Sequence, residues 1–114
     1  MEEFYTIKEN TAVEITEKKS KFIANIYYIE SREQAEIIIK ETKKKYHDAR
    51  HNCFAYRVID NDIIIEKNSD DGEPSGTAGA PILNILSKED IVNTLVIITR
   101  YFGGILLGTG GLVK

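Results

Sequence analysis

The sequence predicts a mixed fold of β-strands and α-helices, on three observations. Two pairs of apolar, β-branched runs flank short polar segments, as the strands of hairpins do. One segment repeats its apolar residues at helical spacing. One unbroken apolar run, "TLVIITR", is typical of a central strand that is covered on its faces. With 114 residues, 42% of them hydrophobic and 29% charged, the chain can bury one modest core, which predicts a single domain.

The first predicted elements are a hairpin and a helix. Residues 13–17 and 21–29 are predicted strands on either side of the polar "KKS", and aromatic and β-branched residues dominate the second strand. Ser31 is a predicted N-cap, and Gln34 completes a capping-box pattern, because each side chain can satisfy a free backbone N–H at the helix start. The apolar residues behind them recur at helical spacing, so helix 32–46 should pack one face on a sheet.

The second half of the chain predicts another hairpin, a loop, a helix and the central strand. "NCFAYRVIDNDIIIEK" holds two apolar runs around Asp60, Asn61 and Asp62, whose short polar side chains favour a turn. "NSDDGEPSGTAGAP" is a loop by composition, and Pro81 has to fall in the first turn of the helix that follows. The apolar residues after Pro81 predict that this helix is short and buried. The strand "TLVIITR" then brings Arg100 to its end.

Charge, cysteine content and hydropathy restrict the class of protein. The net charge of −3 argues against a uniformly cationic nucleic-acid binder, and the single cysteine, Cys53, excludes an intramolecular disulfide. No stretch is long and apolar enough to span a bilayer, and "MEEFYTIKEN" lacks the basic and apolar regions of a signal peptide. We therefore expect a cytoplasmic protein that has no membrane partner.

The charges are unevenly distributed along the chain. A basic segment precedes an acidic one that contains Asp60, Asp62, Glu66 and the acids of the loop. The lysines of the basic segment are either the solvated end of a helix or part of a surface that binds an anionic partner. The basic residues are Lys40, Lys43, Lys44, Lys45, Arg50 and Arg57.

Four sequence blocks, in order, resemble one protein family. They are "KKSKFIA", "HNCFAYR", "SDDGEPSGTAGAPIL" and "VIITRYFGGILLGTGGLVK", and together they span essentially the whole chain. The pattern is similar to the N-terminal domain of the IMPACT/YigZ family in its bacterial form. The resemblance implies an α+β fold like domain two of ribosomal protein S five, with two or three helices on a mainly antiparallel sheet. It also implies that residues 1–114 form one such domain, which ends before the usual ferredoxin-like second domain.

Glycines crowd the segment after Arg100. Their exposed N–H groups could cradle a phosphate at a helix start, or the glycines could simply turn the chain and permit close packing. The chain lacks a Walker motif and the acidic residue of a Rossmann site, so nucleotide hydrolysis is not expected. The glycines assigned to a ligand site are Gly103, Gly104, Gly108 and Gly110.

Three acids and three soft ligands are further candidates for a site. Three interpretations are open for the acids Asp70, Asp71 and Glu73. They could form an exposed turn, they could ligate a hard cation, or they could pair with Arg100 if the end of its strand lies close. Zinc could bind to the soft ligands, but a closed structural site needs four of them and the segment offers His47, His51 and Cys53 alone. We therefore predict no metal, no cofactor and no catalytic residue.

These features together predict a non-enzymatic binding module. By resemblance, eukaryotic members restrain a translation-initiation kinase, and bacterial members are candidates to bind nucleic acid or the ribosome. We expect RNA or the ribosome as partner, or a translation-related protein. The predicted binding residues are Lys43, Lys44, Lys45, Arg50, Arg57, Arg100, the three acids and the four glycines.

Two other classes stay open from the sequence. An enzyme acting on a phosphorylated small molecule would use the acids with a divalent ion, and it would show a concave pocket where the acids, Arg100 and loop N–H groups converge. A protein-interaction domain would show an exposed apolar patch, through which the chain could also self-associate.

Overall fold

The computed structural model describes residues 4–102 and has an α+β fold. Neither helix in this range is long and apolar enough to cross a membrane. In chain order the elements are β1 (Thr11–Glu17), β2 (Ser20–Tyr28), α1 (Arg32–Lys45), β3 (His51–Asp60), β4 (Ile63–Ser69), α2 (Gly79–Lys88) and β5 (Thr94–Tyr101).

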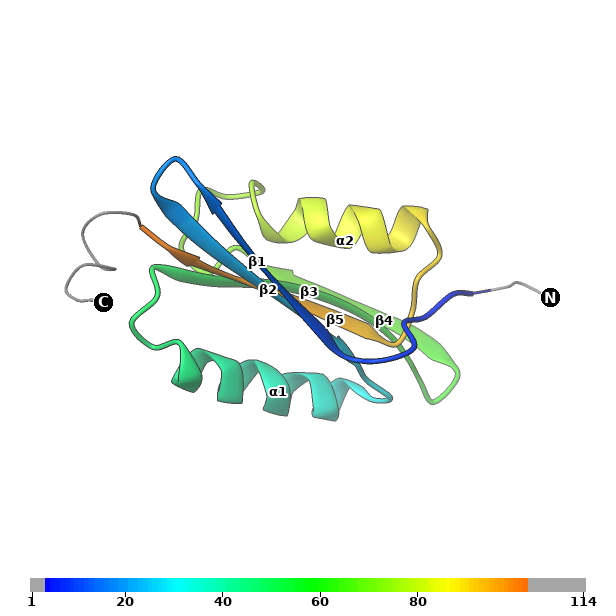
Figure 1. Cartoon of the computed structure of the whole chain (residues 1–114). Coiled ribbons are helices and arrows are strands. Elements are labelled where there is room, and N and C mark those ends of the chain that lie inside the picture. Colours follow the sequence, from blue (N-terminus) through cyan, green and yellow to red (C-terminus); the bar gives the residue numbers. More distant parts are fainter. Residues whose placement is uncertain (1–3, 103–114) are drawn as a thin grey trace.

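The five strands form one antiparallel sheet in the order β1-β2-β5-β3-β4. Both predicted hairpins are confirmed, and "TLVIITR" is confirmed as the central strand β5. Each helix connects two parallel strands that have a third strand between them: α1 connects β2 to β3, and α2 connects β4 to β5. The two helices cover opposite faces of the sheet (Figure 1), so the two crossovers have opposite handedness and one is of the uncommon left-handed kind.

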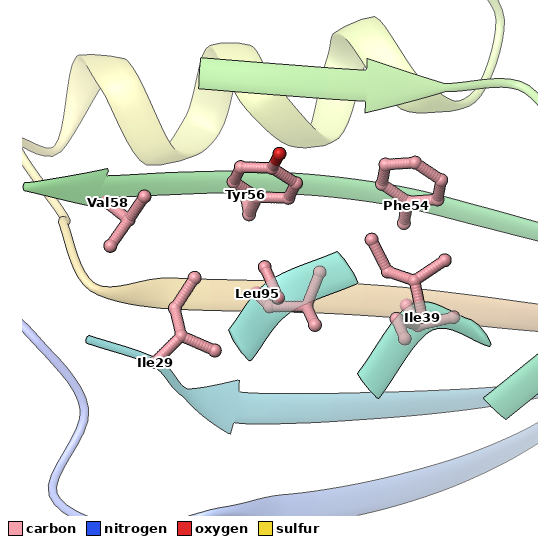
Figure 2. Close-up of a cluster of buried hydrophobic side chains, with 8 residues drawn as sticks. Ile29, Ile39, Phe54, Tyr56, Val58 and Leu95 are labelled. Carbon is pink, nitrogen blue, oxygen red and sulfur yellow. The ribbon is translucent and has the colours of Figure 1, made fainter. Parts of the chain in front are cut away.

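The main hydrophobic core lies between α1 and the centre of the sheet. Figure 2 shows Phe54, Tyr56 and Val58 of β3 and Leu95 of β5 on the face of the sheet where Ile39 of α1 lies. Burying this apolar surface is the main term that holds α1 on the sheet, at roughly 1.5–3 kcal/mol for each large side chain. The cluster consists of Ile29, Ala35, Ile39, Phe54, Tyr56, Val58, Leu95 and Ile97.

Helix α1 begins where the sequence predicts. The Ser31 hydroxyl accepts the N–H of Gln34 at 3.0 Å, and the Gln34 side chain accepts the N–H of Glu30 at 2.8 Å. The second bond goes to the residue before the cap, so the capping box is closed one position earlier than usual.

Helix α2 is less buried than the sequence predicts. Pro81 lies in its first turn, as expected, but Leu86 is buried whereas Ile85 is 62% exposed. The prediction of a buried helix is wrong because α2 packs over β3 and β4 and leaves its other flank open. Gly79 explains the close approach to β4: a Cβ there would lie 2.8 Å from the backbone N and O atoms of Ser69.

Candidate functional site

Asp70 caps α2 from the loop before it. Its Oδ1 accepts the N–H groups of Gly79 at 2.8 Å and Ala78 at 3.1 Å, and its Oδ2 accepts that of Gly76 at 2.8 Å. N–H groups at a helix start have no partner within the helix. The bonds to Gly79 and Gly76 are the main causes that lower the pKa of Asp70. Asp70 is therefore engaged in positioning α2.

Asp71 connects the same loop to β3 through a hydrogen bond and to α1 through an ion pair. Its Oδ2 accepts the backbone N–H of Asn52 at 2.7 Å, and its Oδ1 lies 3.5 Å from Nζ of Lys43. Gly72 follows with a φ of +93°, and a Cβ there would lie 3.2 Å from Nδ1 of His51. Glycine is required at this position because of both its backbone conformation and the closeness of the ring.

Glu73 pairs with Arg100. Nη1 of Arg100 donates to the two carboxylate oxygens at 2.9 and 3.2 Å, and the Glu73 side chain is only 14% exposed. His51 lies beside this pair: its Nδ1 is 2.8 Å from the carbonyl oxygen of Asp71, and its Nε2 is 3.7 Å from Oε1 of Glu73. A carbonyl can only accept, so Nδ1 carries a proton. Of the alternatives that the sequence leaves open, pairing with Arg100 is what the structure shows for Glu73, but not for Asp70 or Asp71.

The three acids do not converge on a cation position, because each faces a different set of partners. Among residues 4–102, no group of three or more His, Cys, Asp and Glu side chains is placed to hold a metal ion. Cys53 is buried, and its Sγ donates to the carbonyl oxygen of Asp70 at 3.1 Å. Burial, with the nearby acids, raises the pKa of its thiol to about 12. Cys53 is thus a protonated core residue at neutral pH.

Two hollows meet at Arg100. The first, of about 470 Å³, opens between the start of α2 and the sheet, and Glu73, Thr77 and Arg100 supply its polar atoms. The second, of about 310 Å³, lies toward the β1–β2 turn and is lined by Glu17, Lys18 and Ser20. Phe22 and Arg100 line both hollows. A concave pocket is one sign expected of an enzyme, but Asp70 and Asp71 do not line it.

A third hollow, of about 300 Å³, lies on the open flank of α2. Its walls are almost entirely aliphatic and include Ile26, Ile82 and Ile85. This is the exposed apolar patch that the sequence associates with protein interaction.

Arginines and aromatic rings alternate at the end of β5. The ring of Phe102, which is 40% exposed, has the guanidinium carbon of Arg50 5.2 Å and that of Arg100 5.1 Å from its centroid. Arg100 also lies 5.8 Å from the Phe22 ring. Such contacts orient the guanidinium groups while leaving their edges able to bind an anion.

One end of the molecule, here called the basic end, gathers cations from three separate segments. The β1–β2 turn, the end of α1 and the end of β5 lie together there (Figure 1). Register places Lys21 opposite Tyr101, and the N–H of Arg50 donates to the carbonyl of Arg100. The basic end comprises Lys18, Lys19, Lys21, Lys43, Lys44, Lys45, Arg50 and Arg100.

The hairpin lysines are the part of this cluster that sequence reasoning missed. The sequence predicts a polar turn region at "KKS" and no binding role for its lysines, yet Lys18 and Lys19 are exposed and both occupy the left-handed region, with φ of 50° and 69°. The equivalent β3–β4 turn uses Asn61 and Asp62, which tolerate that region well. A signal was present in the sequence: two lysines stand where a two-residue hairpin turn favours Asn and Gly.

Arg57 does not belong to the basic end, so its predicted place on that surface is wrong. It pairs in register with Thr94, six positions along β5 from Arg100, which corresponds to about 20 Å. Its Nε donates to Glu66 at 2.7 Å and its Nη1 to the carbonyl of Ile91 at 3.2 Å, and the residue is buried. Arg57 faces inward because odd residues of β3 point toward α2.

The opposite end of the molecule is acidic. The β3–β4 turn, the start of α1 and the end of α2 lie there (Figure 1), and they carry Asp60, Asp62, Glu33, Glu89 and Asp90. The predicted glycine site lies outside the described residues, since Gly103, Gly104, Gly108 and Gly110 all follow residue 102.

Comparisons with known proteins agree on one family. Residues 18–114 match the model of the Impact N-terminal domain. The chain is 45% identical over 111 residues to the IMPACT family member YvyE of Bacillus subtilis, covering 97% of this chain and 51% of that protein. The chain thus spans about half the length of this curated relative.

Solved structures give the same result. One, described as a hypothetical protein, has a TM-score of 0.78 and 37% identity, covering 91% of this chain and 51% of that one. Another, described as the two-domain translational regulator Yih1, has a TM-score of 0.66 and 29% identity, covering 86% of this chain and 39% of that one. The loop acids Asp70, Asp71 and Glu73, which contact α2, β3 and Arg100, lie within the matched residues 18–114. The chain therefore belongs to the IMPACT family.

Proposed function

We propose that the chain is an RNA-binding domain that acts in the regulation of translation, in the cytoplasm, where translation takes place. The observation that carries the proposal is the gathering of eight cations at the basic end from three separate segments. Five of these form no ion pair with any described residue. Clustered cations neutralise phosphates and release their counterions, which supplies most of the affinity in sequence-independent binding. These five are Lys18, Lys19, Lys44, Lys45 and Arg50.

The net charge of −3 is compatible with this proposal. Asp60, Asp62, Glu33, Glu89 and Asp90 lie at the far end of a molecule that is 52 Å long, several Debye lengths away at physiological salt, whereas Asp71 and Glu73 at the basic end are paired with Lys43 and Arg100. An RNA strand would therefore meet the basic end first, with the acidic end pointing away from it.

The β1–β2 turn gives independent support. A non-glycine residue in the left-handed region costs roughly 1–2 kcal/mol, and Lys18 and Lys19 both occupy it. Strain of this kind persists where the side chains have a role that other residues would not fill. The role that we assign to these two side chains is contact with phosphates.

The translational context comes from a relative. The neighbour described as Yih1 is a translational regulator, and it shares 29% identity with this chain over 86% of its length. RNA is the most abundant anionic surface of the translation machinery, and RNA recognition through shape and phosphate suits a cluster of lysines and arginines.

The test compares two double variants that each remove two positive charges. Lys44→Gln/Arg50→Gln acts at the basic end, and Lys8→Gln/Lys88→Gln acts near the acidic end. Each phosphate contact on a single strand contributes about 0.7 to the salt slope, so losing two should weaken binding roughly 25-fold at 0.1 M salt. Binding is measured by fluorescence anisotropy of a labelled single-stranded RNA. The control should bind within about twofold of wild type, because its charges lie more than a Debye length from the basic end and are screened by salt. Equal losses in both variants would contradict the proposal.

A further inference from the structure

The larger hollow beside Arg100 has walls of two kinds. One side is apolar and is formed by Phe22 and Ile98 of the sheet and by Ala78, Pro81 and Ile82 at the start of α2. The polar atoms lie at Glu73, Thr77 and Arg100. A volume of about 470 Å³ lies within the range of pockets that hold small organic groups. Few, localised polar atoms in an apolar slot match a flat group with a polar edge.

The polar atoms of this hollow include both acceptors and donors, because Arg100 gives an Nη1–H to Glu73 while its buried Nε has no hydrogen-bond partner among the described residues. The Glu73 carboxylate oxygens accept from Arg100, and each has a lone pair left for a further donor. The Thr77 hydroxyl donates to the carbonyl of Pro74, which leaves its oxygen free to accept. Acceptors and donors together at the edge of an apolar slot suit a nucleobase, whose ring edge carries both.

The cations lie where a strand would enter and leave the hollow. Arg100 lines both hollows, the guanidinium carbon of Arg50 lies 5.2 Å from the centroid of the Phe102 ring, and Lys18 lines the second hollow. Phosphates on either side of a base could therefore meet Arg100 and Arg50 on one side and Lys18 on the other. Glu17 also faces the second hollow, so a phosphate there would have to lie nearer Lys18.

We propose that the larger hollow binds one unpaired nucleotide of an RNA strand, with its base between Phe22 and the start of α2. This inference rests on the proposed function and narrows it to single-stranded RNA. A base that is paired in a duplex presents neither its faces nor its pairing edge. The same hollow would also accept a free mononucleotide, but cations adjoin both hollows, so a strand with several phosphates gains contacts that a mononucleotide lacks.

The test fills the hollow without changing charge. Ala78→Phe places a ring in the hollow, and Asn84→Phe adds the same ring on the exposed side of α2 as a matched control. A labelled single-stranded oligonucleotide carrying one 2-aminopurine reports both affinity and stacking, and a duplex and AMP serve as competitors. Stacking of one base is worth about five-fold or more in affinity. Ala78→Phe should bind the single-stranded oligonucleotide about five-fold more weakly and should no longer quench 2-aminopurine. Its affinity for the duplex and its salt slope should not change. Asn84→Phe should match wild type in every measurement.

The outcomes separate the two proposals. If Ala78→Phe binds and quenches like wild type while Lys44→Gln/Arg50→Gln is weak, the hollow is not a nucleotide site and RNA binding stands. If neither variant differs from wild type, both proposals fail. AMP binding tighter than the oligonucleotide would overturn the assignment to an RNA strand. If Ala78→Phe does not fold, amide NMR shifts in the wild type decide: shifts at Thr77 and Ile82 support the site, and shifts confined to the lysines overturn it.

Discussion

Replacing the two lysines of the β1–β2 turn should strengthen the fold and weaken RNA binding at the same time. Lys18 and Lys19 have φ of 50° and 69°, and Glu17 pairs with Ser20 across the turn. Asn-Gly is the preferred pair for a two-residue turn of this shape. The variant Lys18→Asn/Lys19→Gly therefore relieves backbone strain and removes two positive charges from the basic end.

The expected magnitudes follow from these two effects. Relief of left-handed strain gains roughly 1–2 kcal/mol per lysine, and the added freedom of glycine in the unfolded chain takes back roughly 0.5–1 kcal/mol. The net gain is therefore roughly 1–3 kcal/mol, and each kcal/mol raises the Tm of a domain of this size by roughly 4–8 °C. Losing two phosphate contacts should weaken single-stranded RNA binding roughly 25-fold at 0.1 M salt and reduce the salt slope by about 1.4.

Thermal unfolding by circular dichroism and anisotropy titrations on the same preparation measure both quantities. A variant that is more stable yet binds RNA as well as wild type would refute the role given to the lysines. A variant that is less stable would refute the strain argument. The opposite signs of the two effects exclude unfolding as the cause of lost binding.

Three further predictions concern the fold around the loop that precedes α2. Gly79→Ala should lower the free energy of unfolding by about 2 kcal/mol, seen in urea titrations, because its Cβ would lie 2.8 Å from backbone atoms of Ser69; an unchanged midpoint would contradict the packing. Asp70→Asn should destabilise the domain at pH 7, and the difference should vanish in acid, because a carboxylate with a lowered pKa stabilises the fold above its unfolded pKa of about 3.9 and loses this effect as the pH falls through the folded value. Cys53 borders the larger hollow but is only 3% exposed and has its thiol pKa raised to about 12, so it should react with a disulfide reagent at pH 8 far more slowly than a free thiol; a rate equal to that of a free thiol would contradict this.

Most of the fold could be predicted from the sequence because its signals are local. The capping pair Ser31 and Gln34, the turn at Asn61 and Asp62, and the apolar run of β5 each act over a few residues. The openness of α2 could not be predicted in this way. Whether Ile85 is buried depends on where α2 crosses the sheet, and that position is set by Gly79 against β4 and by the Asp70 cap.

The candidate site was only partly predictable, for a related reason. Charge order along the chain grouped Arg57 with the helix lysines, but strand alternation turns its side chain toward α2 and six residues of strand separate it from Arg100. The lysines of the first hairpin join the basic end through sheet register, which no local pattern contains. The pairing of Glu73 with Arg100 was one open alternative, and only tertiary structure could select it.

The salt dependence of RNA binding by the wild-type chain tests the central claim most directly. If about five of the cations at the basic end contact phosphates of a single strand, the affinity should fall roughly 100-fold between 50 and 200 mM salt. Anisotropy titrations of a labelled single-stranded RNA at these two concentrations measure this fall. Binding that does not change with salt, or no binding at 50 mM, would contradict the claim that the basic end is an RNA-binding surface.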